Sequence, residues 1–209
     1  LYNRFKLFLY EIKHPDHPWL TQQANAILSS CLRKTDVELE FGSGRSTIWF
    51  AKRVHTLTSV EHDPIWYEKV RKKLAECNIR DAKLCLYETR RSNYEQIENN
   101  PYVKIADNFP DKSLDFVLID GIFRCECALR VLRKIKLGGL LIIDNINRYL
   151  PSTSNAPCSR TKEDGSASQR WQLLAELLKG WRCIWTSNGV TDTAIWVKPS
   201  CQKNSLGYP

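Results

Sequence analysis

A strand that breaks at two glycines and continues as a helix most narrows the folds open to this chain. Residues 37–51 read VELEFGSGRSTIWFA, in which an alternating pattern ends at Phe41 and a helical pattern follows Gly44. A simple turn needs one glycine. Two glycines separated by one residue, between a strand and a helix, indicate that a ligand lies against this backbone.

Extended and helical patterns alternate along most of the chain. The predicted helices are at about 46–53, 64–77 and 125–135, and the predicted strands are at 37–41, 56–61, 83–88, 114–120 and 140–146. The runs LDFVLID and LLIID are nearly continuously apolar, as in parallel strands that are covered on both faces. The alternation predicts a doubly wound, mostly parallel α/β sheet.

The C-terminal part of the predicted sheet domain has a different pattern. Two β-rich runs flank the turn formers at 187–189, which predicts a C-terminal antiparallel hairpin. A helix with Trp171 and Leu174 on its apolar face comes before the hairpin. The stretch 147–168 is rich in turn formers, and we expect it to be a lid or a substrate loop.

Residues 1–19 predict an N-terminal helix and a connector. Apolar side chains at helical spacing indicate that this helix packs on the body of the protein: Tyr2, Phe5, Leu9 and Ile12. The chain has no methionine, so we expect the natural N-terminus to lie elsewhere. No apolar run approaches the ~18 residues of a membrane span, and we expect no membrane partner.

Eight cysteines raise the alternatives of disulfides, zinc or free thiols. Their positions form no C-x-x-C pair and include no histidines at zinc-finger spacing: 31, 77, 85, 125, 127, 158, 183 and 201. Several lie within apolar patterns, where a free thiol behaves as a small hydrophobic group. We therefore expect reduced cysteines and a cytoplasmic protein.

The chain carries a formal charge of +8, from 31 Lys and Arg against 23 Asp and Glu. A basic balance is compatible with a nucleic-acid partner or an acidic substrate. The charges are scattered over several predicted helices, which favours solvated helix faces over a dedicated patch. A nucleic-acid partner is therefore possible but not favoured, and the sequence gives no oligomeric state.

The polar residues around the two glycines indicate which ligand fits. In an open α/β sheet, ligands bind at the carboxyl ends of the strands. The glycine loop of a dinucleotide-binding protein has a third glycine, and this chain has Thr47 at that position. Glu40 disfavours a pyrophosphate and favours an amine. Glu61 ends the next strand, where it can accept hydrogen bonds from ribose hydroxyls, or help to cap a helix for which Asp63 is the better candidate. S-adenosylmethionine has an ammonium group and a ribose but no phosphate, so it suits both carboxylates.

Four motifs in this order resemble those of the class I S-adenosylmethionine-dependent methyltransferases: ELEFGSGRST, SVEHD, LDFVLIDG and LGGLLIIDN. The resemblance covers about residues 20–198, leaves a tail at 199–209, and implies a Rossmann-like methyltransferase fold with seven strands. It implies that Glu61 holds the ribose and that His62 lies against adenine. The residues implied to hold the methionine part are Glu40, Gly42, Ser43 and Gly44.

A second polar group is predicted where two later strands end. Asp120, Asp144 and Asn145 can converge at the carboxyl edge of the sheet, and their oxygens suit Mg²⁺ or another divalent cation. Catechol-type and caffeoyl-coenzyme A-type O-methyltransferases show a similar arrangement, which implies metal-assisted catalysis by these three residues. That family has a lysine base where this chain has Phe123, and the following Arg124 cannot accept a proton. The alternative is that these residues contact cofactor, substrate or loop backbone without metal.

The methyl acceptor is less determined than the cofactor. We expect a small-molecule acceptor, acidic or phenolic, that is methylated on oxygen. Arg124, Arg148 and Arg160 follow the strand ends and can either bind an acidic acceptor or face solvent. An RNA or protein methyltransferase and a non-catalytic S-adenosylmethionine-binding module are the alternatives.

Overall fold

The computed structural model describes residues 2–89 and 94–200, so most of the predicted tail at 199–209, with Cys201, lies outside it. Seven strands form one mixed sheet in the order β3-β2-β1-β4-β5-β7-β6. The strands are β1 (Val37–Phe41), β2 (Thr56–Glu61), β3 (Ala82–Leu86), β4 (Leu114–Ile119), β5 (Ile135–Asp144), β6 (Arg182–Ser187) and β7 (Asp192–Val197). The first five strands are parallel, and β7 is antiparallel to both β5 and β6.

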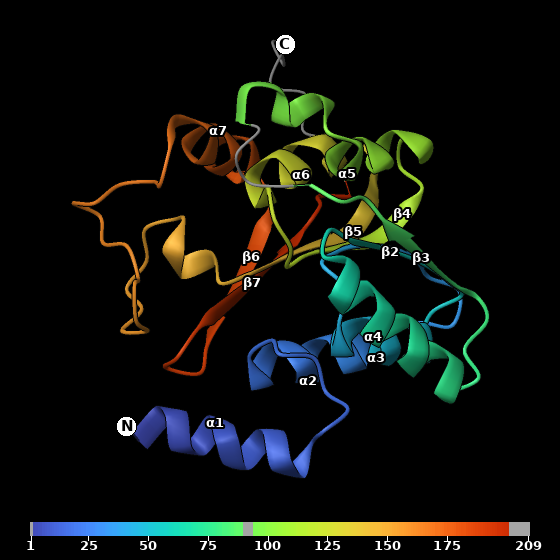
Figure 1. Cartoon of the computed structure of the whole chain (residues 1–209). Helices are drawn as coiled ribbons and strands as arrows, with labels where there is room; N and C mark the ends of the chain where they lie inside the picture. The colour runs from blue at the N-terminus through green and yellow to red at the C-terminus, as the bar shows by residue number, and fades with distance from the viewer. Residues whose placement is uncertain (1, 90–93, 201–209) are drawn as a thin grey trace.

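Helices cover both faces of the sheet. They are α1 (Tyr2–Lys13), α2 (Gln22–Cys31), α3 (Arg45–Ala51), α4 (Pro64–Glu76), α5 (Pro101–Lys104), α6 (Arg124–Val131) and α7 (Gln169–Leu178). Figure 1 shows α5, α6 and α7 over one face and α2, α3 and α4 over the other, with α1 beyond α2. Short 3₁₀ helices are Tyr94–Asn99, Ile105–Asn108 and Ile146–Arg148.

Two main apolar cores lie on the two faces of the sheet because side chains alternate along each strand. On β1, Leu39 and Phe41 belong to the core beneath α5, α6 and α7. On the other face, Leu28 of α2 and Phe50 of α3 pack on Phe116 of β4. This arrangement confirms the doubly wound sheet with a C-terminal hairpin that the sequence predicts.

Capping side chains determine where two of the helices begin. The side chain of Thr21 accepts a hydrogen bond from the amide of Ala24 at the start of α2 (3.3 Å). Asp63 caps α4 in the same way, accepting from the amide of Trp66 (2.9 Å), with Pro64 as the first helical residue. These caps fix the direction in which each chain segment leaves the sheet edge.

One strand is longer than predicted, and one observed helix was not predicted. Strand β5 begins at Ile135, five residues before the predicted start at 140. The glycines at 138 and 139 resemble a strand breaker, but a Cβ at Gly139 would lie 2.7 Å from the carbonyl oxygen of Asp115, so the strands approach closely there. Helix α5 has only four residues, too few for a periodic pattern.

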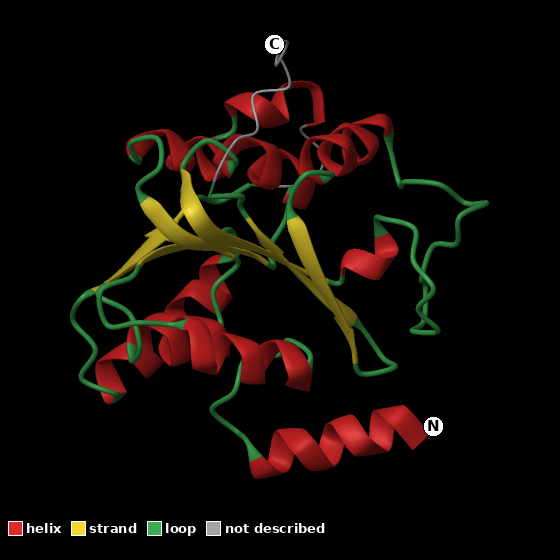
Figure 2. Cartoon of the chain, turned by 180° about the vertical axis from the view of Figure 1, so that it is seen from behind, coloured by secondary structure: helices red, strands yellow, loops and turns green. Residues whose placement is uncertain are grey.

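The expected packing of the first helix on the body is wrong. Helix α1 forms, but none of its residues is buried, and the four side chains expected to pack on the body are exposed: Tyr2, Phe5, Leu9 and Ile12. Figure 2 shows α1 on the outside of the helical layer, and no described helix or strand covers its outer side. None of the described helices has the length and apolar character needed to cross a bilayer.

A chain of hydrogen bonds joins the start of α2 to the carboxyl end of β5. The amide of Thr21 donates to the hydroxyl of Thr193 on β7 (3.1 Å). That hydroxyl in turn donates to Oδ1 of Asp144 (2.6 Å). All three residues are buried, so the N-terminal segment is linked directly to the sheet edge where the predicted site lies.

Candidate cofactor and acceptor site

A groove of about 320 Å³ lies at the carboxyl ends of β1, β2 and β4. It is formed by the loop after β1, the start of α4 and the end of β4. Its lining residues are Trp19, Gly42, Ser43, Gly44, Arg45, Ser46, Glu61, His62, Asp63, Trp66, Asp120 and Gly121. Five of the six predicted cofactor residues lie in this groove, and Glu40 does not.

The two glycines of the loop have different physical roles. Gly42 has φ +94°, and a Cβ there would lie 2.6 Å from the amide nitrogen of Gly121, so it allows β1 and β4 to approach each other. Gly44 has φ 177°, which any residue adopts. A Cβ at Gly44 would meet no atom closer than 3.9 Å and would stand in the groove. The space for a ligand therefore comes from Gly44, while Gly42 shapes the sheet edge.

The amides of the loop are already used within the protein. Ser43 donates its amide to Oε2 of Glu61 (3.0 Å), and Gly44 donates its amide to the hydroxyl of Thr47 (2.8 Å). The Ser43 hydroxyl is buried and has no hydrogen-bond partner among the described residues. It is therefore a polar group of the loop that a ligand can satisfy.

Glu61 lies in the wall of the groove and is only 3% exposed. Its Oε1 accepts from the amides of His62 (2.7 Å) and Asp63 (2.9 Å). Burial alone would raise the pKa of Glu61, but the hydrogen bonds from His62 and Asp63 outweigh burial and hold the pKa below its usual value. Glu61 is therefore an ionised acceptor beside the groove, which is compatible with its predicted contact to a ribose.

His62 follows Glu61 and is half-buried in the same wall. Its Nδ1 lies 2.8 Å from Oε1 of Glu61. Its ring packs edge to face against the Tyr102 ring, with the ring centroids 6.1 Å apart. These two contacts fix the orientation of the imidazole. The predicted contact between His62 and adenine stays a prediction.

Glu40 is 0% exposed, and the structure contradicts direct contact with a ligand in the groove. Its Oε2 accepts hydrogen bonds from the hydroxyls of Thr47 (2.6 Å) and Ser59 (2.5 Å). Because alternate residues of β1 face opposite sides, the carboxyl group points beneath α3. Glu40 thus holds the loop and the first turn of α3 from below.

Burial raises the pKa of Glu40 to about 7, although hydroxyl hydrogen bonds lower it. The folded protein therefore binds this proton more tightly than the unfolded chain, whose reference pKa is 4.5. The contribution to stability is complete below the unfolded pKa and is lost as pH rises through about 7. We expect the free energy of unfolding to fall by about 2–3 kcal/mol more in the wild type than in Glu40→Gln between about pH 5 and about pH 8.

Urea unfolding of both proteins across this pH range tests the Glu40 prediction. Glu68→Gln, at an exposed carboxyl group of α4, is the control and should follow the wild type. Parallel pH profiles for wild type and Glu40→Gln would contradict the shifted titration of Glu40.

Three side chains that the sequence analysis did not single out complete one wall of the groove. Trp19 and Trp66 stack with ring centroids 6.2 Å apart, and the Arg45 guanidinium lies 4.8 Å from the Trp19 ring. Trp66 also donates its indole N–H to the Ser43 carbonyl (2.6 Å). Nη1 of Arg45 is buried without a hydrogen-bond partner in the described chain. The position of Arg45 directly after the glycine loop was the available signal.

The predicted second group does converge, and Arg124 stands in the middle of it. Its Nη2 donates to the carbonyl (2.6 Å) and Oδ1 (2.8 Å) of Asp120, and its Nε donates to the carbonyl of Gly121 (3.0 Å). Its Nη1 donates to the carbonyl of Asp144 (3.0 Å) and to Oδ1 of Asn145 (2.9 Å). A guanidinium has five N–H donors, and these five bonds use all of them. Arg124 therefore clamps the ends of β4 and β5 and is not free to bind an acidic acceptor.

The same contacts show that the predicted ligands do not fit a divalent cation. Oδ1 of Asp144 accepts a hydrogen bond from the Thr193 hydroxyl (2.6 Å), and its Oδ2 accepts one from the side-chain amide of Asn145 (2.7 Å). Oδ1 of Asn145 and Oδ1 of Asp120 accept from Arg124, so a metal would have to displace the guanidinium. Within residues 2–89 and 94–200, no cluster of three His, Cys, Asp or Glu side chains is suited to hold a metal. The expected metal site is corrected to an arginine-centred cluster.

Asp120 and Asp144 share the compensating charge of Arg124, and Arg148 also acts on Asp144. Burial raises the pKa of both carboxyl groups, and the neighbouring Asp144 raises that of Asp120 further, against the lowering effect of Arg124. Asp144 is 3% exposed, whereas the side chain of Asp120 is 29% exposed, so solvent moderates the shift at Asp120. Of the three residues predicted to be catalytic, only Asp120 lines the groove.

The irregular loop at 147–168 is held by its own contacts. Arg160 donates to the carbonyls of Gly165 (2.6 Å) and Asp164 (2.7 Å), so it supports the loop. The Tyr149 ring stacks on Trp171 of α7, with centroids 4.5 Å apart and planes 11° apart. Tyr149 therefore covers the edge of the core. The role of this loop as a lid or substrate loop stays a prediction.

No protein-family model matches the chain, and no curated protein matches its sequence. Solved structures do match its fold. A candidate methyltransferase from Streptococcus mutans in complex with SAH has a TM-score of 0.59 and 11% identity, over 85% of this chain and 96% of that chain. A methyltransferase-like protein from Silicibacter pomeroyi has a TM-score of 0.54 and 23% identity, over 88% and 90%. An rRNA methylase from Streptococcus thermophilus has a TM-score of 0.53 and 11% identity, over 85% and 95%.

Proposed function

Because the chain has the Rossmann-like fold of class I methyltransferases, we propose that it is an S-adenosylmethionine-dependent methyltransferase. The observation that carries this proposal is the groove beside Gly44 and Glu61. Gly44 leaves the backbone open to a ligand, and Glu61 places an ionised carboxylate at the carboxyl end of β2. An ionised carboxylate at this place suits ribose hydroxyls and repels phosphates.

The groove offers each part of the proposed cofactor a group of matching chemistry. Glu61 would accept hydrogen bonds from the ribose, and His62 would lie beside the base. Ser43 and Gly44 would face the methionine part, and the buried N–H of Arg45 that lacks a partner suits its carboxylate. The cofactor supplies an electrophilic methyl group when it is bound.

We propose oxygen of a small molecule as the methyl acceptor, without metal assistance. Asp120 supports this proposal because it lines the groove, and only its Oδ1 has a hydrogen-bond partner among the described residues. Oδ2 can accept a hydrogen bond from an acceptor hydroxyl and orient it. Positioning of this kind in a shaped pocket accounts for large rate gains in transfer reactions.

A second candidate acceptor is RNA. The groove adjoins a cavity of about 280 Å³ through Gly44, Arg45 and Trp66, and Lys69 and Lys73 line that cavity. Cations along such a path suit a phosphate backbone. The cytoplasmic location and the reduced cysteines stay predictions.

Calorimetric titration with S-adenosylmethionine and with SAH tests the cofactor, and turnover of a metabolite panel with labelled methyl donor tests the acceptor. We expect saturable binding and methylation that EDTA does not reduce. Absence of binding would contradict the proposal, and binding without turnover of metabolites or RNA would indicate a non-catalytic module. Methylation abolished by EDTA would restore the metal-assisted route.

Glu61→Ala is expected to weaken binding of SAH by about 1–3 kcal/mol, because a charged hydrogen-bonding site is lost. Calorimetry on a variant shown to be folded by circular dichroism measures the change. Glu68→Ala, outside the groove, is the control and should bind like the wild type. Unchanged affinity in Glu61→Ala would refute the ribose assignment.

A further inference from the structure

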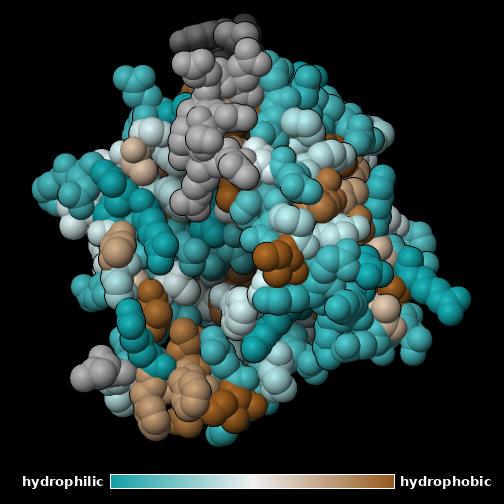
Figure 3. Space-filling view, in the orientation of Figure 1, coloured by the Kyte–Doolittle hydropathy of each residue, from teal (hydrophilic) through white to brown (hydrophobic). Residues whose placement is uncertain are grey.

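Helix α1 presents an apolar face to solvent. Five of its side chains are strongly exposed: Tyr2 (68%), Phe5 (59%), Phe8 (57%), Leu9 (42%) and Ile12 (59%). In Figure 3 a brown and tan area lies at the lower edge of the molecule, where Figure 1 places α1. A continuous exposed apolar face of this kind marks an interaction surface.

The opposite side of α1 attaches the helix to the body. Asn3 donates to the carbonyl of Gly189 in the hairpin turn (3.5 Å), and a Cβ at Gly189 would lie 2.1 Å from the Asn3 side chain. At the other end, the Tyr10 hydroxyl is hydrogen-bonded to Nδ1 of His17 (2.7 Å). Both ends of α1 are therefore anchored with its apolar face outward.

Cations border this apolar face. At about 100° per residue, Lys6 and Lys13 fall between the apolar face and the attached side, and Arg4 falls on the other border. Glu11 is the only acidic residue of the helix. An apolar aromatic face with flanking cations is the pattern of helices that lie in a lipid–water interface.

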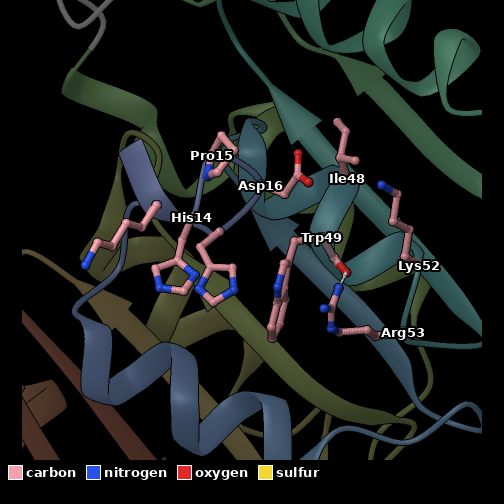
Figure 4. A pocket seen from close by; sticks show the side chains of 9 residues that line it. His14, Pro15, Asp16, Ile48, Trp49, Lys52 and Arg53 are labelled. Carbon is pink, nitrogen blue, oxygen red and sulfur yellow. Dashed lines mark hydrogen bonds between the residues drawn. The ribbon is translucent and has the colours of Figure 1, made fainter. Parts of the chain in front are cut away.

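A basic cavity of about 270 Å³ adjoins the C-terminal end of α1. Figure 4 shows His14, Asp16, Trp49, Lys52 and Arg53 around it, and Arg53 lies 4.0 Å from the Trp49 ring. Lys13 also lines it, so one cation borders both the apolar face and the cavity. The cavity has Asp16 as its single carboxylate, so its charge complements a phosphate.

The dimensions of α1 argue against a second copy of the chain as the partner. A stable protein interface buries about 800 Å² on each partner. Helix α1 has 12 residues and is about 18 Å long. Five side chains that are each 42–68% exposed supply less area than such an interface needs. Binding to a bilayer does not require a minimum interface area, because each apolar side chain that enters the acyl chains contributes its own free energy of burial.

We propose that α1 binds the surface of an anionic phospholipid bilayer, with its apolar face among the acyl chains and Lys6, Lys13 and the basic cavity at the headgroup phosphates. This binding is independent of the methyltransferase proposal. It requires no membrane span, and it revises the expectation of no membrane partner for a surface contact.

Co-sedimentation with phosphatidylcholine vesicles, with and without added phosphatidylglycerol, tests the proposal. The full chain should bind the anionic vesicles more tightly. Phe5→Ser combined with Phe8→Ser should weaken binding to them roughly 30-fold. Lys6→Glu combined with Lys13→Glu should weaken it roughly tenfold or more.

The matched control changes two leucines on α7 that are each 50% exposed, through Leu173→Ser and Leu177→Ser. This control should bind vesicles like the wild type, and circular dichroism should report whether each variant is folded. Equal loss in the control and the phenylalanine variant would overturn the proposal. A lack of binding to the anionic vesicles would also overturn it. A dimer, seen by sedimentation velocity, that the phenylalanine variant dissociates would then assign the apolar face to a second copy of the chain.

Discussion

Replacing Arg124 by methionine is expected to lower the free energy of unfolding by about 3–5 kcal/mol. The side chain is 12% exposed and donates five hydrogen bonds that join the carboxyl ends of β4 and β5. Methionine keeps much of the volume but removes every donor. Asp120 and Asp144 would then lose their shared compensating charge in a buried setting.

Arg130→Met is the matched control because Arg130 lies on the same helix and pairs with the exposed Asp107. An exposed ion pair contributes about 0–1 kcal/mol, so this variant should remain close to the wild type. Urea unfolding at neutral pH measures both changes. Equal effects of the two substitutions would show that Arg124 is not the clamp of the sheet edge.

Gly42→Ala is expected to lower the free energy of unfolding by about 3–5 kcal/mol and to abolish the proposed binding of SAH in the groove. The new Cβ would lie 2.6 Å from the amide nitrogen and 2.7 Å from Cα of Gly121. Both contacts are to backbone, so β1 and β4 would have to move apart. The residue would also keep a φ of +94°, which L-residues rarely adopt.

Gly138→Ala separates these two effects. Gly138 has φ +77°, but its Cβ would meet nothing within 4 Å. This control should therefore show the backbone strain of about 1–2 kcal/mol alone. Urea unfolding and SAH titration of both variants give the comparison. Equal destabilisation would mean that the contact between Gly42 and Gly121 is not limiting.

The sheet was largely predictable because the hydrophobic pattern of each strand depends on which of its faces are buried. LDFVLID and LLIID are apolar at nearly every position, which only strands covered on both faces require. β1 and β2 have the predicted bounds, and the hairpin forms about the predicted turn. Periodicity fails where a segment is too short, as in α5, or where a glycine marks close approach, as at Gly139.

The site was predictable as a location but not as a set of contacts. Sequence position brings Asp120 and Asn145 to one edge, but it does not show that Arg124, four residues after Asp120, turns back between them. Likewise, alternation along β1 is visible in the sequence. Whether Glu40 faces a ligand or the underside of α3 depends on which helix covers that face of the sheet.

The N-terminal helix shows a further limit of pattern analysis. An amphipathic pattern predicts that a face will be covered, but it does not name the covering surface. The polar residues Asn3 and Tyr10 make the contacts that hold α1 to the body. Its apolar face is therefore not covered by any described helix or strand of this chain.

The hydrogen bonds from Thr21 through Thr193 to Asp144 have a practical consequence for anyone who shortens this protein. A fragment that begins after Thr21 would keep every strand and lose only Leu20 from the two main cores. It would nevertheless lack the amide that orients the Thr193 hydroxyl, and Asp144 would then be held by a hydroxyl that is free to rotate. Work on trimmed fragments would thus report on an acidic cluster different from that of the longer chain.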